Sequence, residues 1–138
     1  MPKVLMVDDD VETLSVVEEF LRHAQFETKV CSDPRKALDV FEAFGPDICL
    51  LNFNMPYMTG AALMEKIKSI DSTVEVIFMT PENQAVLAIH LMRCGAHDYL
   101  LKPVLRPLSL FDLIKNQREH IALFPLMLNN RGFFIHCP

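Results

Sequence analysis

The sequence predicts an α/β fold built on a doubly wound, five-stranded parallel sheet. Short apolar segments alternate five times along the chain with segments of helical periodicity. The third apolar segment, residues 48–52, is hydrophobic without alternation up to its last residue, as a strand covered on both faces requires. Such strict alternation favours parallel strands joined by right-handed crossovers, with helices on both faces of the sheet.

The first half of the chain contains two strand–helix units. Residues 3–7 form a short apolar strand, and a second strand covers about residues 27–31. A second helix begins at Asp33-Pro34, with the aspartate as N-cap and the proline in the first turn, and ends at Gly45-Pro46. The helix between the two strands is predicted from apolar residues that share one face: Leu14, Val17, Leu21 and Ala24.

The second half of the chain repeats the same unit three times. A proline-containing loop that reaches Gly60 separates the third strand from its helix, and Ser109 with Asp112 resembles a capping pair for the last helix. The predicted elements are, in order, strand 48–52, helix 61–70, strand 75–80, helix 84–94, strand 98–101 and a helix that begins near Ser109.

Composition and charge limit the classes of function that the chain can have. The chain has 138 residues, of which 51% are hydrophobic, and this is enough for one domain with its own core. Its net charge of −5 disfavours contact with a phosphate backbone, so we expect no nucleic-acid partner. No apolar run reaches the roughly 18 residues that a membrane span needs, and the N-terminus lacks a signal-peptide layout. We therefore expect no membrane partner and a cytoplasmic location.

Polar residues whose side chains could bind a ligand or take part in a reaction lie at the ends of four predicted strands: Asp8 and Asp9, Asn52, Thr80, and Lys102. Because sites in open parallel sheets lie outside the carboxyl ends of the strands, we expect these residues on one rim. Paired carboxylates suit a hard cation such as Mg²⁺, and a hydroxyl and an ammonium suit phosphoryl oxygens. Acidic residues after a strand can also simply cap the next helix, and we favour that interpretation for Asp10 alone.

Five short motifs occur along the chain in a recognisable order and spacing: residues 7–9, 46–52, 55–60, 78–80 and 95–103. With these motifs, residues 1–122 resemble the receiver domain of bacterial two-component response regulators. The resemblance implies a flavodoxin-like (CheY-like) fold with strand order 2-1-3-4-5. It also implies a role in phosphorelay signal transduction that is exerted by protein–protein contact, with a sensor histidine kinase or another signalling protein as partner, and no enzymatic activity.

The resemblance further implies a Mg²⁺ site. Asp8 and Asp9 match the acidic pair that binds the ion, Asp9 directly and Asp8 mainly through water. Asn54 matches the position whose backbone carbonyl completes the metal shell, and Asn52 still offers a carbonyl oxygen. Because an amide at position 52 leaves one negative charge fewer than the aspartate usual in this family, we expect Mg²⁺ to bind more weakly.

Three further residues match the phosphoryl pocket and switch of the family. Thr80 matches the hydroxyl that moves to the phosphoryl group, and Tyr99 matches the aromatic side chain that swings inward with it. Lys102 matches the lysine that pairs with phosphoryl oxygens. The surface that changes partner on activation in this family comprises the fourth helix, fifth strand and fifth helix, and it is one candidate face for a homodimer.

Two positions depart from the family pattern. Asn52 stands where the phosphate-accepting aspartate is expected, and a carboxamide is too weak a nucleophile to form an acyl phosphate. Pro81 follows Thr80 where a small residue usually donates a backbone N–H to the phosphoryl group, and proline has no N–H. Together they favour a natural pseudo-receiver over an engineered acceptor mutant of a phosphate-accepting parent, and the second alternative stays open.

The amide at position 52 also changes the expected role of Lys102. Without a carboxylate there, the ammonium can pair with Asp8 or Asp9 instead. Such a pair would occupy the pocket in a fixed, signal-independent state. On this hypothesis the domain acts as a constitutive docking module.

Residues 123–138 form an apolar C-terminal tail outside the resemblance. Two apolar stretches, 124–128 and 133–135, flank a turn signal at residues 129–132. The tail is too short for a DNA-binding output domain and too hydrophobic for a solvated linker. Two arrangements stay open: the tail folds back onto the domain, or it packs across a dimer interface.

Two other classes of function compete with the receiver. A Mg²⁺-dependent small α/β phosphatase-like enzyme needs a nucleophilic aspartate, which Asn52 denies, so Asp8 or Asp9 would have to serve. A flavodoxin-like cofactor binder needs a phosphate loop after the first strand, where the run of aspartates would repel a phosphate. The receiver is therefore the favoured interpretation.

Overall fold

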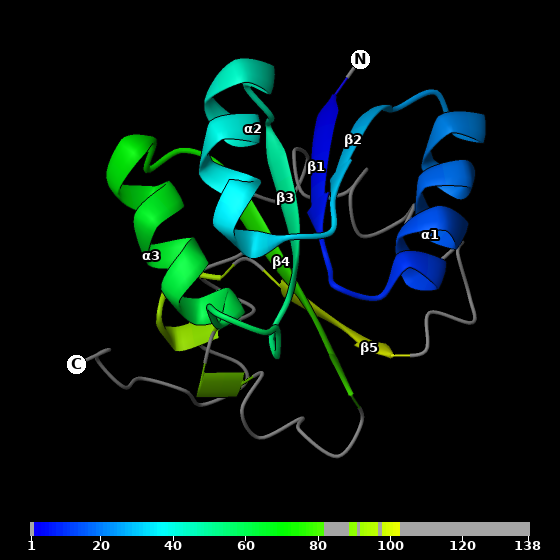
Figure 1. The fold of residues 1–138 in the computed structure, drawn as a ribbon. Helices are drawn as coiled ribbons and strands as arrows, with labels where there is room; N and C mark the ends of the chain where they lie inside the picture. The colour runs from blue at the N-terminus through cyan, green and yellow to red at the C-terminus, as the bar shows by residue number, and fades with distance from the viewer. Residues whose placement is uncertain (1, 82–88, 91, 97, 103–138) are drawn as a thin grey trace, which may run out of the picture.

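The computed structural model describes residues 2–81, 89–90, 92–96 and 98–102, and Figure 1 shows its ribbon. The predicted fifth helix and the tail lie outside the described residues, as does most of the predicted fourth helix. The elements are β1 (Lys3–Val7), α1 (Val11–His23), β2 (Glu27–Cys31), a 3₁₀ turn (Pro34–Lys36), α2 (Ala37–Phe44), β3 (Ile48–Asn52), α3 (Gly60–Ile70), β4 (Glu75–Pro81) and β5 (Asp98–Lys102).

The strands form one five-stranded sheet in the order β2-β1-β3-β4-β5, and every neighbouring pair is parallel. The predicted fold class and strand order are therefore confirmed. All five residues of the central strand β3 are buried, which explains why this strand is apolar without alternation. Val7 of β1 is paired with Leu51 of β3, so the carboxyl ends of these two strands lie next to each other.

Helices cover both faces of the sheet, with α1 on one face and α2 and α3 on the other (Figure 1). Successive side chains of each strand point to opposite faces of the sheet, as the pleat requires. Leu5 and Leu51 belong to the core beneath α2 and α3, whereas Met6 and Leu50 belong to the core beneath α1. The two cores hold the strands from both sides and leave their carboxyl ends as one polar rim.

Side-chain caps fix where the helices beside this rim begin. Asp10 is the N-cap of α1, and its carboxylate accepts hydrogen bonds from Glu12 N at 3.1 Å and Thr13 Oγ1 at 2.8 Å. Thr59 caps α3 by accepting from Ala62 N at 3.1 Å. Each such cap stabilises a helix by about 1 kcal/mol. Asp10 thus acts as the predicted cap.

Candidate functional site

Asp8 is the first residue beyond β1, and its side chain is fully buried. Its backbone N–H donates to the carbonyl oxygen of Cys31 at 3.2 Å, which continues the contact between β1 and β2. Its Oδ1 accepts a hydrogen bond from the backbone N–H of Asp10 at 2.9 Å. Because a buried carboxylate is costly without donors, this bond helps to hold Asp8 at the rim. Asp9 follows Asp8 and is exposed.

Asn52 ends β3, and only 6% of it is exposed. Its side-chain nitrogen Nδ2 donates to Asp9 Oδ1 at 3.0 Å and to the backbone carbonyl oxygen of Asn54 at 2.8 Å. The first bond joins residues that are 43 positions apart, so it ties the end of β3 to the end of β1. Asn52 therefore contacts both Asp9 and Asn54. All three residues belong to the one site that the sequence predicts.

The loop after β3 is folded tightly against the strand it leaves. Gly60 N donates to Phe53 O at 2.7 Å, and Phe53 N donates to Met79 O at 3.2 Å. A Cβ atom at Gly60 would lie 2.3 Å from the carbonyl oxygen of Asn52, closer than a real side chain comes. Only glycine therefore allows α3 to begin this close to the end of β3. The same loop carries the Asn54 carbonyl, which accepts a hydrogen bond from the Asn52 amide.

Thr80 and Lys102 lie near the carboxyl ends of β4 and β5, beyond β3, whereas Tyr99 is earlier in β5, opposite Phe78. In the pairing of β4 with β5, Thr80 lies opposite Leu101 and Pro81 opposite Lys102. The backbones of Thr80 and Lys102 therefore lie at the same end of the sheet as Asn52. The roles predicted for these three side chains, and the predicted pairing of Lys102 with Asp8 or Asp9, lie outside the described side chains.

A second set of contacts joins two loops near this rim. The Arg35 guanidinium lies 3.8 Å from the centre of the Tyr57 ring, and its Nη2 lies 2.9 Å from Asp33 Oδ2. Hydrogen bonds from Arg35 lower the pKa of the Asp33 carboxyl. Tyr57 has a φ of 71°, a conformation rare for an aromatic residue. The sequence held no signal for the contact of Arg35 with Tyr57, because residue type and spacing do not predict the positive φ of Tyr57.

The rim offers oxygen atoms but no nucleophile at the end of β3. Asp8 and Asp9 supply carboxylates, and Asn54 supplies a carbonyl, which are ligands that hard cations prefer. Within the residues that the structure describes, however, no group of three or more His, Cys, Asp or Glu side chains is placed to hold a metal ion. The group at the central position is an amide whose nitrogen faces the neighbouring oxygens.

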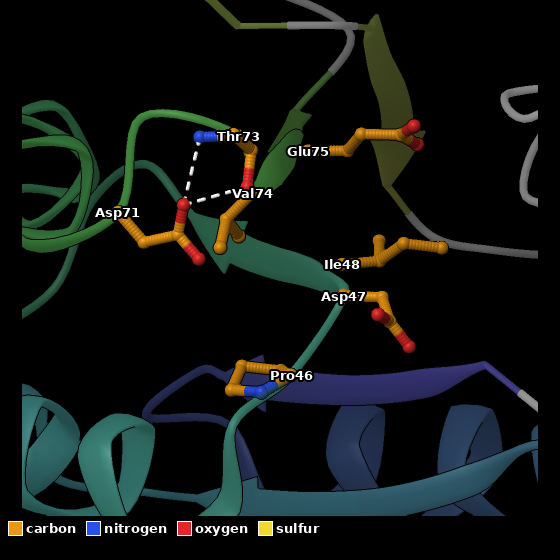
Figure 2. A pocket seen from close by; sticks show the side chains of 7 residues that line it. All are labelled: Pro46, Asp47, Ile48, Asp71, Thr73, Val74 and Glu75. Carbon is orange, nitrogen blue, oxygen red and sulfur yellow. Dashed lines mark hydrogen bonds between the residues drawn. The ribbon is translucent and has the colours of Figure 1, made fainter.

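The opposite end of the sheet also carries carboxylates, around a shallow cavity of about 200 Å³. Figure 2 shows that the carboxylates of Asp47, Asp71 and Glu75 lie apart from one another. Asp47 accepts from Lys3 N at 2.9 Å, and Asp71 accepts from the backbone and hydroxyl of Thr73 at 2.9 and 2.6 Å. Asp47 and Asp71 thus accept hydrogen bonds from different residues.

A parallel sheet of this order, with an acidic rim at the carboxyl ends of its strands, defines an α/β protein of the receiver class. The model of the family described as "Response regulator receiver domain" matches residues 4–115. The chain therefore belongs to the response regulator receiver domain family. Members of this family are generally signalling domains of two-component systems, partner with histidine kinases and other signalling proteins, and bind Mg²⁺ at the acidic pocket.

Individual relatives agree with this assignment. Regulatory protein AtoC of Escherichia coli (strain K12) is 32% identical over 101 residues, which are 73% of this chain and 22% of AtoC. A response regulator receiver domain protein from Clostridium thermocellum superposes with a TM-score of 0.81 at 27% identity, covering 89% of this chain and 98% of that one. The chemotaxis protein CheY4 of Vibrio cholerae gives a TM-score of 0.77 at 26% identity, covering 84% and 98%.

The chain spans less than half the length of the curated relatives it matches. The likeness therefore concerns the receiver part of those proteins. Among the helices that the structure describes, none has the length and apolar character that crossing a membrane would need.

Proposed function

We propose that this chain is a pseudo-receiver, a receiver domain that does not accept a phosphoryl group and signals by protein–protein contact. The observation that carries the proposal is the buried amide of Asn52 at the end of β3, the acceptor position of the fold. Its nitrogen is hydrogen-bonded to Asp9 and to the Asn54 carbonyl. An acyl phosphate needs a carboxylate oxygen as nucleophile, and an amide held in this way supplies none.

Pro81 supports the same proposal from the neighbouring strand. It ends β4 opposite Lys102 and has no N–H to donate at the rim. A pocket that lacks both the acceptor carboxylate and this donor is two changes away from a phosphate-binding one. A single engineered substitution accounts for only one of the two changes, so we favour a natural pseudo-receiver.

The proposed unit comprises residues 1–122. Its proposed site residues are Asp8, Asp9, Asn52, Asn54, Thr80, Tyr99 and Lys102. Its partner is a sensor histidine kinase or another cytoplasmic signalling protein, and neither nucleic acid nor membrane takes part. A homodimer would form through the fourth helix, fifth strand and fifth helix or through the tail. Because no observation favours the phosphatase-like alternative over the signalling role of the family, we do not propose an enzymatic activity.

The test is incubation with a small phosphodonor and Mg²⁺, followed by intact-mass measurement, on this chain and on Asn52→Asp. We expect no mass increase for this chain and the mass of one phosphoryl group on the Asn52→Asp variant. If neither protein is labelled, Pro81 blocks the chemistry as well, and Asn52→Asp combined with Pro81→Ala is the next variant. A phosphoryl group on this chain itself would overturn the proposal.

A further inference from the structure

We infer that the side-chain amide of Asn52 takes the place of the divalent cation in this pocket, so that the rim is held together without metal. The inference rests on the proposed function, because a domain that accepts no phosphoryl group has no need of a cation to bind one. It concerns a different property, however: how the end of β3 is joined to the end of β1 and to its own loop.

The amide nitrogen lies where two oxygen atoms from distant parts of the chain converge. Nδ2 of Asn52 is 3.0 Å from the carboxylate oxygen Oδ1 of Asp9 and 2.8 Å from the carbonyl oxygen of Asn54. One oxygen follows β1 and the other belongs to the loop after β3. Carboxylate and backbone carbonyl oxygens are the usual protein ligands of Mg²⁺. The amide therefore engages the same pair of atoms that a cation at this rim would use.

The chemistry of the partners fixes the orientation of the amide. An ionised carboxylate and a backbone carbonyl can only accept hydrogen bonds, so each needs a donor. The nitrogen of the amide carries two N–H groups, one for each acceptor, whereas its oxygen carries none. Turning the amide over would place its oxygen against two other oxygens and lose both bonds. The nitrogen must therefore face Asp9 and Asn54.

A Mg²⁺ ion does not fit beside this amide. The ion needs near-octahedral oxygen ligands at about 2.0–2.1 Å, so it would have to lie between the two oxygens that Nδ2 now contacts. The N–H groups present their positive ends to the same space and would repel the cation. Binding would require Asn52 to rotate away and give up both hydrogen bonds. Cation and amide thus exclude each other.

Having Asn52 in place of an aspartate and a cation also limits the negative charge of the pocket. An aspartate at position 52 would add a third carboxylate beside Asp8 and Asp9, and Asp8 is fully buried. Close carboxylates repel one another, and a bound cation relieves that repulsion. Asn52 removes that repulsion and supplies donors in the cation's place. The result is a pocket that is complete in the absence of metal.

The experiment compares thermal unfolding and direct Mg²⁺ titration for this chain, Asn52→Asp and Asn52→Ala, in EDTA and in excess Mg²⁺. We expect the Tm of this chain to be the highest of the three in EDTA and to be unchanged by Mg²⁺. The Tm of Asn52→Asp should be lower in EDTA and rise with Mg²⁺, and its affinity for the ion should be about tenfold higher or more. Asn52→Ala should be less stable and gain nothing from Mg²⁺.

The matched control is Gln25→Glu. It makes the same change from amide to carboxylate at an exposed position in the turn between α1 and β2, at the opposite end of β2 from the rim. Any response of its Tm to Mg²⁺ measures the general effect of one added negative charge. The response of Asn52→Asp must exceed it for the pocket to be the cause.

Two results would overturn the inference. One is Mg²⁺ binding to this chain with an affinity within about threefold of Asn52→Asp, since the amide would then not exclude the ion. The other is a Tm for Asn52→Ala in EDTA equal to that of this chain, since the amide would then hold nothing together. Both can occur while this chain stays unlabelled by a phosphodonor, so failure here is distinct from failure of the proposed function.

Discussion

The two ends of the sheet both gather carboxylates but hold them in different ways. At the amino end, Asp47 and Asp71 each accept from backbone N–H groups, and their carboxylates lie apart (Figure 2). At the carboxyl end, Asp9 shares one side-chain donor with the carbonyl oxygen of Asn54. In the first arrangement, each carboxylate accepts from its own backbone group, at the start of a strand or in a loop. The second has a common centre, the nitrogen of Asn52.

This difference shows why nearness of acidic residues is weak evidence for a site. Carboxylates around a cavity do not make a binding centre when they accept from different backbone groups, as Asp47 and Asp71 do. Convergence on one point is more informative, because it requires the ends of two strands and a loop to be placed together by the whole fold. The following predictions test whether the carboxyl end behaves as one connected unit and the amino end as independent parts.

The largest effect is expected from Gly60→Ala. The new Cβ would meet the backbone carbonyl of Asn52, which cannot move aside as a flexible side chain could. The loop and the start of α3 must shift, so we expect the free energy of unfolding to fall by about 2 to 3 kcal/mol. Urea unfolding followed by circular dichroism measures the change.

Gly45→Ala is the control for this substitution. Gly45 ends α2 with a φ of 63°, and no atom lies within 4 Å of the position of its Cβ. Here the cost is backbone strain alone, about 1 kcal/mol. Equal losses for the two variants would show that the close approach of Gly60 to β3 is not what makes it necessary.

A smaller effect is expected for the hydrogen bond between Asp9 and Asn52. A double-mutant cycle of Asp9→Ala and Asn52→Ala should give a coupling free energy of about 1 to 2 kcal/mol, because one partner is charged and the other is buried. Pairing Asp71→Ala with Asn52→Ala should give additive losses, since these residues belong to opposite ends of the sheet. Coupling in the second cycle would contradict the independence of the two ends.

Much of the fold was predictable because it depends on patterns that the chain repeats. The burial of β3 follows from its unbroken apolar run, and the cap by Asp10 follows from an acidic residue just before a helical stripe. The strand order came from the resemblance of whole motifs. Each of these predictions depends on residue type and spacing, which the sequence itself contains.

The details of the site were less predictable because they depend on orientation. The sequence indicates that position 52 holds an amide, and the sequence-based interpretation gave its oxygen to a metal, but no pattern indicates which end of the amide faces Asp9. The contact of Arg35 with Tyr57 was also hidden, because it needs a positive φ that residue type disfavours at a tyrosine. The orientation of an amide and a contact between two loops can be determined only from the three-dimensional structure.

The smallest effect is expected at the amino end, from Thr73→Val. Hydrogen bonds from the Thr73 hydroxyl and backbone N–H lower the pKa of the Asp71 carboxyl. Because the folded-state pKa is lowered, the contribution of this carboxylate to stability is present above its unfolded pKa, about 3.9, and is lost as the pH falls through the folded value. Removing the hydroxyl should raise the pKa of Asp71 but leave it below the ordinary value, since the backbone donor remains.

An NMR titration of the Asp71 carboxyl carbon measures this pKa, and Thr73→Ser, which keeps a hydroxyl, should leave it lowered. An unchanged pKa in Thr73→Val would show that the backbone donor alone sets it. Neither substitution should alter the response of the Tm to Mg²⁺, because Asp71 shares no donor with Asp9 or Asn52. If Thr73→Val did change that response, the two ends of the sheet would be coupled, and the contrast between separate caps and a shared centre would fail.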